Sequence, residues 1–249
     1  MLNKKGEFVM NIIKLMAEKS KKPNEAKIPT IAFLGDSVTQ GCFELYMKAE
    51  NVYETEFDSE YAYHNCLKKI FSVLFPNVPL NIINAGISGN NSTDGLNRLE
   101  RDVIAYKPDL TVVCFGLNDN WKGADGIEEY KNNLKTIFSK LKESGSEVIC
   151  MTANMMCDYV NYRLDRPEFK EIAEGTAKQQ NDGRADMYFS AAKEVAAECG
   201  VKICDVYSKW KRMNELGVDT TELLSNYINH PKREMHWLFA SSLVDAMME

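Results

Sequence analysis

The sequence lacks both a long apolar run and any closely paired cysteines. No stretch among its 249 residues approaches the ~18 consecutive apolar residues that a membrane span needs. Its seven cysteines include no C-x-x-C pair, which argues against a zinc knuckle and against a thioredoxin-type redox site. Scattered, reduced thiols are typical of cytoplasmic proteins, so we expect a cytoplasmic location and no membrane span.

An excess of positive charge is also missing. The chain contains 30 basic and 36 acidic side chains, a formal net charge of -6, and no basic block. This balance opposes nonspecific binding to nucleic acid or to anionic membranes, so we expect no nucleic-acid partner. A small neutral substrate fits the charge better than a polyanion does, and the sequence leaves the oligomeric state open.

Motifs that bind nucleotides or metal ions do not occur either. Neither a Walker sequence nor G-x-G-x-x-G is present, which argues against a flavodoxin-like nucleotide or flavin binder. No residues have metal-ligand spacing, and the G-x-S-x-G nucleophile elbow of the α/β-hydrolases is missing. We therefore expect no cofactor and no metal ion.

Short apolar runs alternate with segments of helical periodicity along the chain. This alternation predicts right-handed βαβ crossovers and a mainly parallel sheet with helices on both faces. No repeat or Pro-, Gly- or Ser-rich linker divides the chain, so we expect one domain over residues 1–249. The predicted strands are residues 30–34, 80–85, 110–115, 147–151 and 201–206, and the predicted helices lie around 63–74, 96–103, 127–141, 187–195 and 235–247.

Three segments depart from this alternation. Residues 1–27 contain an apolar stretch that Asn11 and Lys14 interrupt and that no small-residue cleavage site follows, which predicts an amphipathic leading helix rather than a signal peptide. Residues 42–59 and 152–183 are long and irregular, and we expect helical pieces in the second. Both follow the carboxyl ends of predicted strands, where long loops often shape a site.

The first predicted strand leads directly into a serine. Residues 31–41 read IAFLGDSVTQG, so that Gly35, Asp36 and Ser37 stand at the strand's carboxyl end. Open α/β sheets form their ligand sites at this end, which places Ser37 at the mouth of a crevice. Asp and Ser also favour helix caps and turns, so a capping role is the alternative.

Two further polar stretches follow the second and third predicted strands. Residues 84–93 read NAGISGNNST, whose glycines allow close backbone approach and whose amides can face a ligand. Residues 116–119 read GLND. Backbone amides and an asparagine side chain are donors that can stabilise negative charge on a carbonyl oxygen.

A serine nucleophile needs a base, and the chain contains three histidines. His230 precedes Pro231, which disfavours helical geometry at residue 230 and suits the first turn of a following helix. His230 is thus well placed for rigid presentation as a base, and the alternative is a loop histidine that is hydrogen-bonded to the backbone. His236, on the last predicted helix, is the second candidate, and His64 is expected at the surface or edge of an amphipathic helix.

Together these stretches resemble the four blocks of the SGNH (GDSL) hydrolase family, whose members include esterases, lipases and acetylesterases. The matching blocks are GDS at 35–37, ISGN at 87–90, GLND at 116–119 and NHP at 229–231, in the family's order, within a resemblance over roughly residues 30–245. The resemblance implies a flavodoxin-like three-layer α/β/α sandwich with a mainly parallel five-stranded sheet.

The same resemblance assigns roles to individual residues. It implies Ser37 as the nucleophile and His230 as the general base. It implies an oxyanion hole made of the backbone amides of Ser37 and Gly89 and the side-chain amide of Asn118. Asp36 and Asp119 are expected to brace the loops.

The family usually carries an aspartate three residues before the histidine, and here that position is Tyr227. Residues 225–230 contain no carboxylate, so a backbone carbonyl or Asn226 would have to orient the ring. Asp219 and Glu222 lie nearby in sequence, but residues 219–222 read as a helix cap with its reciprocal partner. We leave the acid unassigned and expect a Ser-His dyad.

The sequence thus predicts a serine esterase that removes a short acyl or acetyl group from a small or carbohydrate substrate through an acyl-enzyme. The competing hypothesis is a catalytically silent small-molecule or carbohydrate-binding module on the same fold, which the missing aspartate favours. Within residues 152–183, Tyr159, Tyr162 and Arg166 are candidates to contact a sugar ring or a carboxylate, unless this segment is an ordinary packed excursion.

Overall fold

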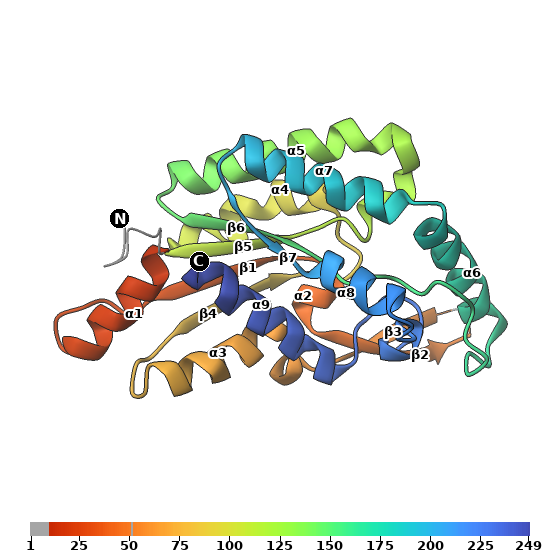
Figure 1. The fold of residues 1–249 in the computed structure, drawn as a ribbon, viewed down its shortest axis with the longest axis horizontal. Coiled ribbons are helices and arrows are strands. Elements are labelled where there is room, and N and C mark those ends of the chain that lie inside the picture. The colour runs from red at the N-terminus through yellow and green to blue at the C-terminus, as the bar shows by residue number, and fades with distance from the viewer. Residues whose placement is uncertain (1–9, 51) are drawn as a thin grey trace.

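A five-stranded parallel sheet in the order β4-β1-β5-β6-β7 forms the centre of the computed structural model, which describes residues 10–50 and 52–249 (Figure 1). Helices cover both faces of this sheet, which confirms the predicted three-layer fold. The strands agree with the predicted ranges apart from single terminal residues. They are β1 (Thr30–Gly35), β4 (Asn81–Gly86), β5 (Leu110–Cys114), β6 (Glu147–Thr152) and β7 (Lys202–Asp205).

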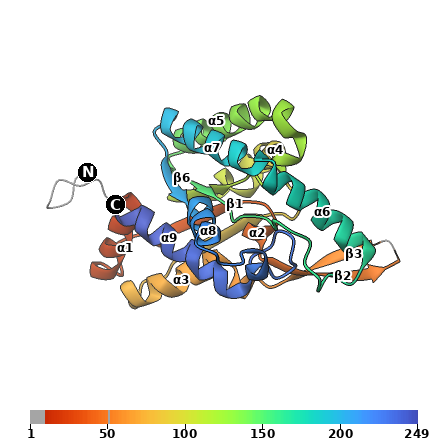
Figure 2. The same cartoon turned by 45° about the vertical axis from the view of Figure 1, so that its right-hand side comes forward.

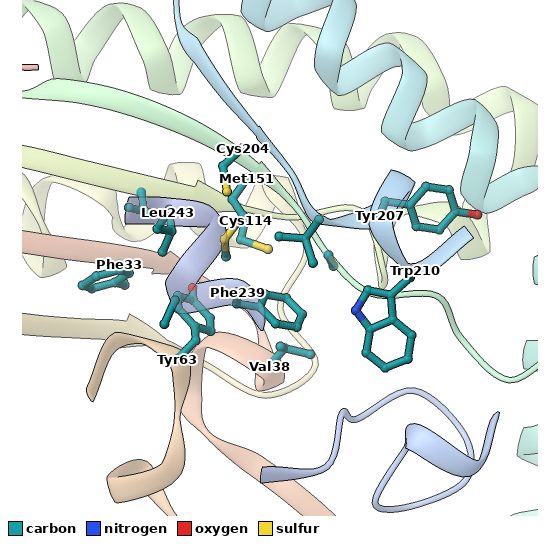
Figure 3. Packing of buried hydrophobic residues seen from close by; sticks show 14 of the residues in the cluster. Phe33, Val38, Tyr63, Cys114, Met151, Cys204, Tyr207, Trp210, Phe239 and Leu243 are labelled. Atoms are coloured by element: carbon teal, nitrogen blue, oxygen red, sulfur yellow. The ribbon is translucent and has the colours of Figure 1, made fainter. Parts of the chain in front are cut away.

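The sheet separates two hydrophobic cores because successive side chains of a strand point to opposite faces. Ile31 and Phe33 of β1 join one core, whereas Ala32 and Leu34 join the other. Figure 3 shows the first core, where Phe33 lies among residues contributed by the sheet and its covering helices. Burial on both faces explains why each strand reads as a short apolar run.

Each of the two cores is covered by its own set of helices. The first core is covered by α1 (Asn11–Lys21), α3 (Tyr63–Leu74), α8 (Val206–Glu215) and α9 (His236–Met248), with α6 (Pro167–Asn181) beside them. The second is covered by α4 (Ser92–Asp102), α5 (Ile127–Glu143) and α7 (Arg184–Glu198). The remaining helices are α2 (Ser37–Gln40) and the short 3-10 helices Ser59–Tyr61, Ile104–Tyr106, Asp119–Gly126, Thr221–Leu223 and Arg233–Met235.

The amphipathic leading helix is α1, while residues 1–9 of the predicted segment lie outside the described residues. Ile12 and Met16 are buried in the first core. The backbone amides of Asn11 and Ile12 donate to the Glu147 carboxylate at 2.8 and 3.1 Å, so an acidic side chain binds the positive end of the helix. Within the described residues, no helix is both long and apolar enough to traverse a bilayer.

The structure corrects the interpretation of residues 42–59 as irregular. They form an antiparallel hairpin of β2 (Cys42–Ala49) and β3 (Val52–Phe57), a separate two-stranded sheet that extends beside α6 (Figure 2). Tyr53 on β3 contacts Phe169 on α6, with their ring centroids 6.3 Å apart. In β2 only Cys42 and Phe43 are buried. Because the rest of this strand has no buried face, its sequence lacks the regular alternation of apolar and polar residues that would predict a strand.

One helix was not predicted, and one expectation about a histidine was wrong. Residues 206–215 form α8, which the sequence analysis did not assign as a helix. His64 is buried rather than at the surface, because α3 packs against both β4 and α9 and the ring lies 5.6 Å from that of Phe33. The helical piece expected within residues 152–183 is α6.

Candidate active site

Ser37 is the first residue of α2, directly after the carboxyl end of β1. The side chain of Asp36 caps this short helix, because its Oδ1 accepts a hydrogen bond of 3.0 Å from the Val38 amide. Gly41 ends the helix in the left-handed region, with φ at 97°. Since Asp36 provides the cap, the Ser37 hydroxyl is left available for another partner.

That partner is His230. The Ser37 Oγ and His230 Nε2 atoms lie 2.9 Å apart, and His230 Nδ1 lies 2.9 Å from the carbonyl oxygen of Phe43. A carbonyl oxygen only accepts hydrogen bonds, so Nδ1 carries the proton and Nε2 is left to accept from the Ser37 hydroxyl. Among the described residues, no carboxylate hydrogen-bonds to the His230 ring.

Asn226 shapes the turn that presents His230 rather than holding the imidazole. Its Oδ1 accepts hydrogen bonds from the backbone amides of Ile228, Asn229 and His230 at 3.0, 2.9 and 3.0 Å. Tyr227 adopts a left-handed conformation with φ at 56°. A backbone carbonyl and Asn226 were the two candidates for orienting the ring, and a backbone carbonyl, that of Phe43, is the group that contacts it.

Burial keeps the His230 ring uncharged near neutral pH. It lowers the pKa of His230 to about 4, and the hydrogen bond to the Phe43 carbonyl opposes this shift in part. His236 is also buried, and its Nδ1 accepts a 3.0 Å hydrogen bond from the Tyr63 amide. His230, the predicted base, therefore accepts the hydrogen bond from the Ser37 hydroxyl, whereas His236 is hydrogen-bonded to the Tyr63 amide.

The groups expected to bind an oxyanion surround one cavity of about 390 Å³. Ser37, Gly89, Asn118 and His230 all line it. Gly89 has φ at 77° and no neighbouring atom within 4 Å of the position a Cβ would take, so its backbone is not crowded by side chains there. Asn118 Nδ2 donates to the Asn90 carbonyl at 2.8 Å, which leaves its second N–H for a ligand.

Two buried carboxylates lie beneath this arrangement. Asp119 Oδ1 accepts a 2.9 Å hydrogen bond from the Ser92 amide and so ties the loop after β5 to the start of α4. Burial, with the nearby charge of Asp119, raises the pKa of Asp36 to about 7. Within the described part of the chain, Oδ2 of each carboxylate is buried without a hydrogen-bond partner.

Sequence reasoning missed the side chains that form the walls of the cavity. All but one of them come from the hairpin and from α6, which lie in the two segments expected to shape a site, and the exception is Trp121. Trp121, which is 52% exposed, stands on the loop after β5. The wall residues are Leu45, Tyr53, Thr55, Trp121, Ile172 and Thr176.

The candidate contacts within residues 152–183 lie elsewhere. Tyr159, Tyr162 and Arg166 are not among the residues that line the cavity. The hydroxyl of Tyr159 donates to Asp219 at 2.7 Å.

The reciprocal cap expected at residues 219–222 is only half formed. Asp219 Oδ1 accepts a 3.1 Å hydrogen bond from the Glu222 amide. The carboxylate of Glu222 binds Asn161 and Arg163 instead of turning back to the helix start. These two carboxylates therefore bind residues 159–163, and neither of them hydrogen-bonds to His230.

Comparison with known proteins supplies a family match and a fold match. The model of the GDSL-like Lipase/Acylhydrolase family matches residues 33–238, which confirms the resemblance drawn from the four motifs. An acetylxylan esterase of Geobacillus stearothermophilus is 29% identical over 131 residues, which span 49% of this chain and 58% of that protein. An arylesterase of Vibrio mimicus is 32% identical over 78 residues, which span 31% of this chain and 38% of that protein. The chain thus matches less than two thirds of the length of these curated relatives.

Solved structures share the fold over most of the chain. The acetylxylan esterase Axe2 from Geobacillus stearothermophilus superposes with a TM-score of 0.64 at 21% identity, covering 89% of this chain and 96% of that one. A lipase/acylhydrolase from Enterococcus faecalis superposes with a TM-score of 0.63 at 24% identity, covering 87% of this chain and 94% of that one. At these identities the likeness bears on the fold.

Proposed function

Because this chain belongs to the GDSL-like Lipase/Acylhydrolase family, we propose that it is a serine esterase that hydrolyses a carboxylic ester through a Ser37–His230 dyad. The observation that carries the proposal is the 2.9 Å contact between Ser37 Oγ and His230 Nε2. A nucleophile and its base within hydrogen-bond reach, with the base oriented by a third group, is the arrangement that acyl transfer needs.

The reaction proceeds in two steps. Ser37 Oγ attacks the ester carbonyl carbon while His230 Nε2 takes the hydroxyl proton. The backbone amides of Ser37 and Gly89 and the Asn118 side chain donate to the oxygen that becomes negative. The intermediate collapses to the acyl-enzyme, and the leaving alkoxide takes the proton from His230. Water then attacks the acyl carbon while His230 Nε2 takes its proton. When this second intermediate collapses, the acid is released and His230 returns the proton to Ser37 Oγ.

We assign this site a short acyl group such as acetyl, carried by a small or carbohydrate alcohol. The cavity of about 390 Å³ suits a small ester group. Tyr53 and Trp121 are 53% and 52% exposed at its wall and offer flat apolar faces to a sugar ring. The similarity to an acetylxylan esterase supports the same substrate class.

One observation favours the alternative of a silent binding module. No carboxylate among the described residues contacts His230, and such a group ordinarily stabilises the charged ring during catalysis. Against this alternative stand the dyad contact and the common cavity of Ser37, Gly89 and Asn118.

Hydrolysis of p-nitrophenyl acetate separates the two functions. We expect turnover by the wild-type protein and a loss of roughly 10³-fold or more in kcat for both Ser37→Ala and His230→Ala. Ser72→Ala, which removes an exposed serine hydroxyl of α3, is the matched control and should retain full activity. Equal rates for wild type and Ser37→Ala would leave the binding module as the function of this site.

A further inference from the structure

We propose that Arg233 is a positioning residue that holds the Phe43 carbonyl against His230, so that this carbonyl can orient the ring in the absence of the usual aspartate. The inference rests on the esterase function proposed above. Arg233 lies three residues after His230 and reaches across to the hairpin, to both residues of the peptide bond whose oxygen contacts the imidazole.

The contacts of the guanidinium group are specific. Arg233 Nη1 donates to Glu44 Oε1 at 2.7 Å, and the guanidinium carbon lies 4.2 Å from the centre of the Phe43 ring. Arg233 Nε also donates to Asp58 Oδ2 at 3.4 Å, immediately after β3. One planar cation therefore binds the start of β2 and the end of β3 together, a combination of fork and stacking contacts that lysine lacks.

The hairpin is irregular at the point where Arg233 binds it. Cys42 pairs with Phe57 and Leu45 with Thr55, so the intervening stretch of β2 contains one residue more than the facing stretch of β3. Such a bulge leaves a residue unpaired and turns its groups away from the strand ladder. The bulge therefore frees the Phe43 carbonyl for His230 but removes the ladder hydrogen bonds that would fix it. The contacts of Arg233 supply that constraint.

Arg233 acts on the dyad without touching the substrate cavity. It lines a separate surface hollow together with Glu44 and Tyr227, and it is not among the residues around Ser37. The Phe43 ring is buried and also packs near the His236 ring, with the two ring centroids 5.0 Å apart. A change at Arg233 should therefore alter the geometry of His230 and leave substrate binding intact.

Arg233→Ala and Arg233→Lys test the assignment in the full chain with p-nitrophenyl acetate. We expect Arg233→Ala to lower kcat roughly 10²-fold, as a misplaced catalytic group does, and to change KM by less than about threefold. Arg233→Lys keeps a cation near Glu44 and should recover part of the loss. The matched control is Arg163→Ala, which removes another arginine that pairs with a glutamate and lies 5.6 Å from an aromatic ring, that of Tyr227. It should retain wild-type kcat.

A direct readout follows the His230 ring itself. In the wild type, the Nδ1 proton of His230 should give a slowly exchanging NMR signal, assigned by its loss in His230→Gln. In Arg233→Ala this signal should broaden or disappear while the protein remains folded by circular dichroism. A purely structural role would lower the melting temperature but leave both the signal and kcat per folded molecule unchanged.

The outcomes distinguish this inference from the proposed function. If Ser37→Ala is inactive but Arg233→Ala keeps wild-type kcat and the Nδ1 signal, the esterase function stands and the role of Arg233 is overturned. The role is also overturned if KM rises while kcat holds, because Arg233 would then act on substrate binding. If wild type and Ser37→Ala hydrolyse the ester equally, the proposed function itself fails.

Discussion

His230 Nδ1 lies 2.9 Å from the carbonyl oxygen of Phe43, so an uncharged backbone group holds the ring. In a Ser-His-Asp triad, a carboxylate both orients the imidazole and stabilises its charged form. A carbonyl orients the ring and selects the same tautomer, but its dipole stabilises positive charge less than a full negative charge does. For the proposed esterase we therefore expect an aligned dyad with only moderate activation of Ser37, and this expectation bears on its pH dependence.

The first prediction concerns the acid side of the pH profile. Burial lowers the pKa of His230 to about 4, so the ring stays neutral and able to accept a proton well below pH 6.5. We expect kcat/KM for p-nitrophenyl acetate to hold to about pH 5 and to fall as the pH approaches about 4. An acid limb centred at or above 6.5 would show that the His230 ring is more solvated than its burial in the structure indicates.

Folding stability must be followed over the same range. Because the folded-state pKa of His230 is below its ordinary 6.5, the unfolded chain binds a proton that the buried ring does not. This residue therefore contributes stability above pH 6.5 that is lost as the pH falls toward about 4. Urea unfolding at each pH separates this loss from protonation of the dyad.

The second prediction concerns Asp36, whose contribution to folding stability changes with pH in the opposite direction. Burial raises the pKa of Asp36 from 3.8 to about 7, so the protonated form is favoured in the folded protein. Its contribution to stability is fully present below pH 3.8 and is lost as the pH rises through about 7. Asp36→Asn keeps an oxygen for the Val38 amide and removes the charge. We expect it to raise the free energy of unfolding at pH 8 by an amount on the order of 4 kcal/mol, and by little at pH 4.

Urea unfolding at the two pH values checks this expectation, with Asp125→Asn at an exposed position as the control. The same gain for Asp36→Asn at both pH values would mean that Asp36 does not change protonation between them. Ser37 follows directly in the chain, so kcat of the variant should be measured alongside its stability.

The third prediction concerns the position where the family usually carries its aspartate. Tyr227 has φ at 56°, its ring centre is 5.6 Å from the Arg163 guanidinium, and its hydroxyl lies 3.5 Å from Arg163 Nη1. The side chain is thus directed to Arg163, and His230 Nδ1 already donates to Phe43. We expect Tyr227→Asp to change kcat by less than about threefold, with Tyr227→Phe as the control. A tenfold or greater gain from aspartate alone would show that the ring can turn to a carboxylate.

The fourth prediction addresses the alcohol portion of the substrate. Trp121 lines the cavity and is 52% exposed. Trp121→Ala should lower kcat/KM for acetylated xylooligosaccharides about tenfold, and should change that for p-nitrophenyl acetate far less, because only the sugar needs the ring face. Trp237→Ala, at a 44% exposed position on α9, is the matched control. Equal losses of kcat/KM on both substrates would show that Trp121 supports the structure of the cavity and does not bind the sugar specifically.

The sequence by itself determined the sheet and the placement of the polar blocks. Strands buried on both faces must be apolar throughout, so each appears as a short uninterrupted run. The loops that follow β1, β4 and β5 come directly after those runs, and parallel strands bring their carboxyl ends to one edge. The polar stretches could therefore be predicted to share one edge, and the resemblance to the family then singled out Ser37, Gly89 and Asn118 within them and His230 as the candidate base.

Only the tertiary structure decided how His230 is oriented and what encloses the substrate. Every residue carries a backbone carbonyl, so no side-chain identity could mark Phe43 as the acceptor. The hairpin that supplies it is mostly exposed and lacks the apolar alternation that reveals a strand. The pKa of Asp36 near 7 likewise arises from burial beside Asp119, a contact between segments after different strands. Long-range packing and desolvation, which a local pattern does not record, set the chemistry of this site.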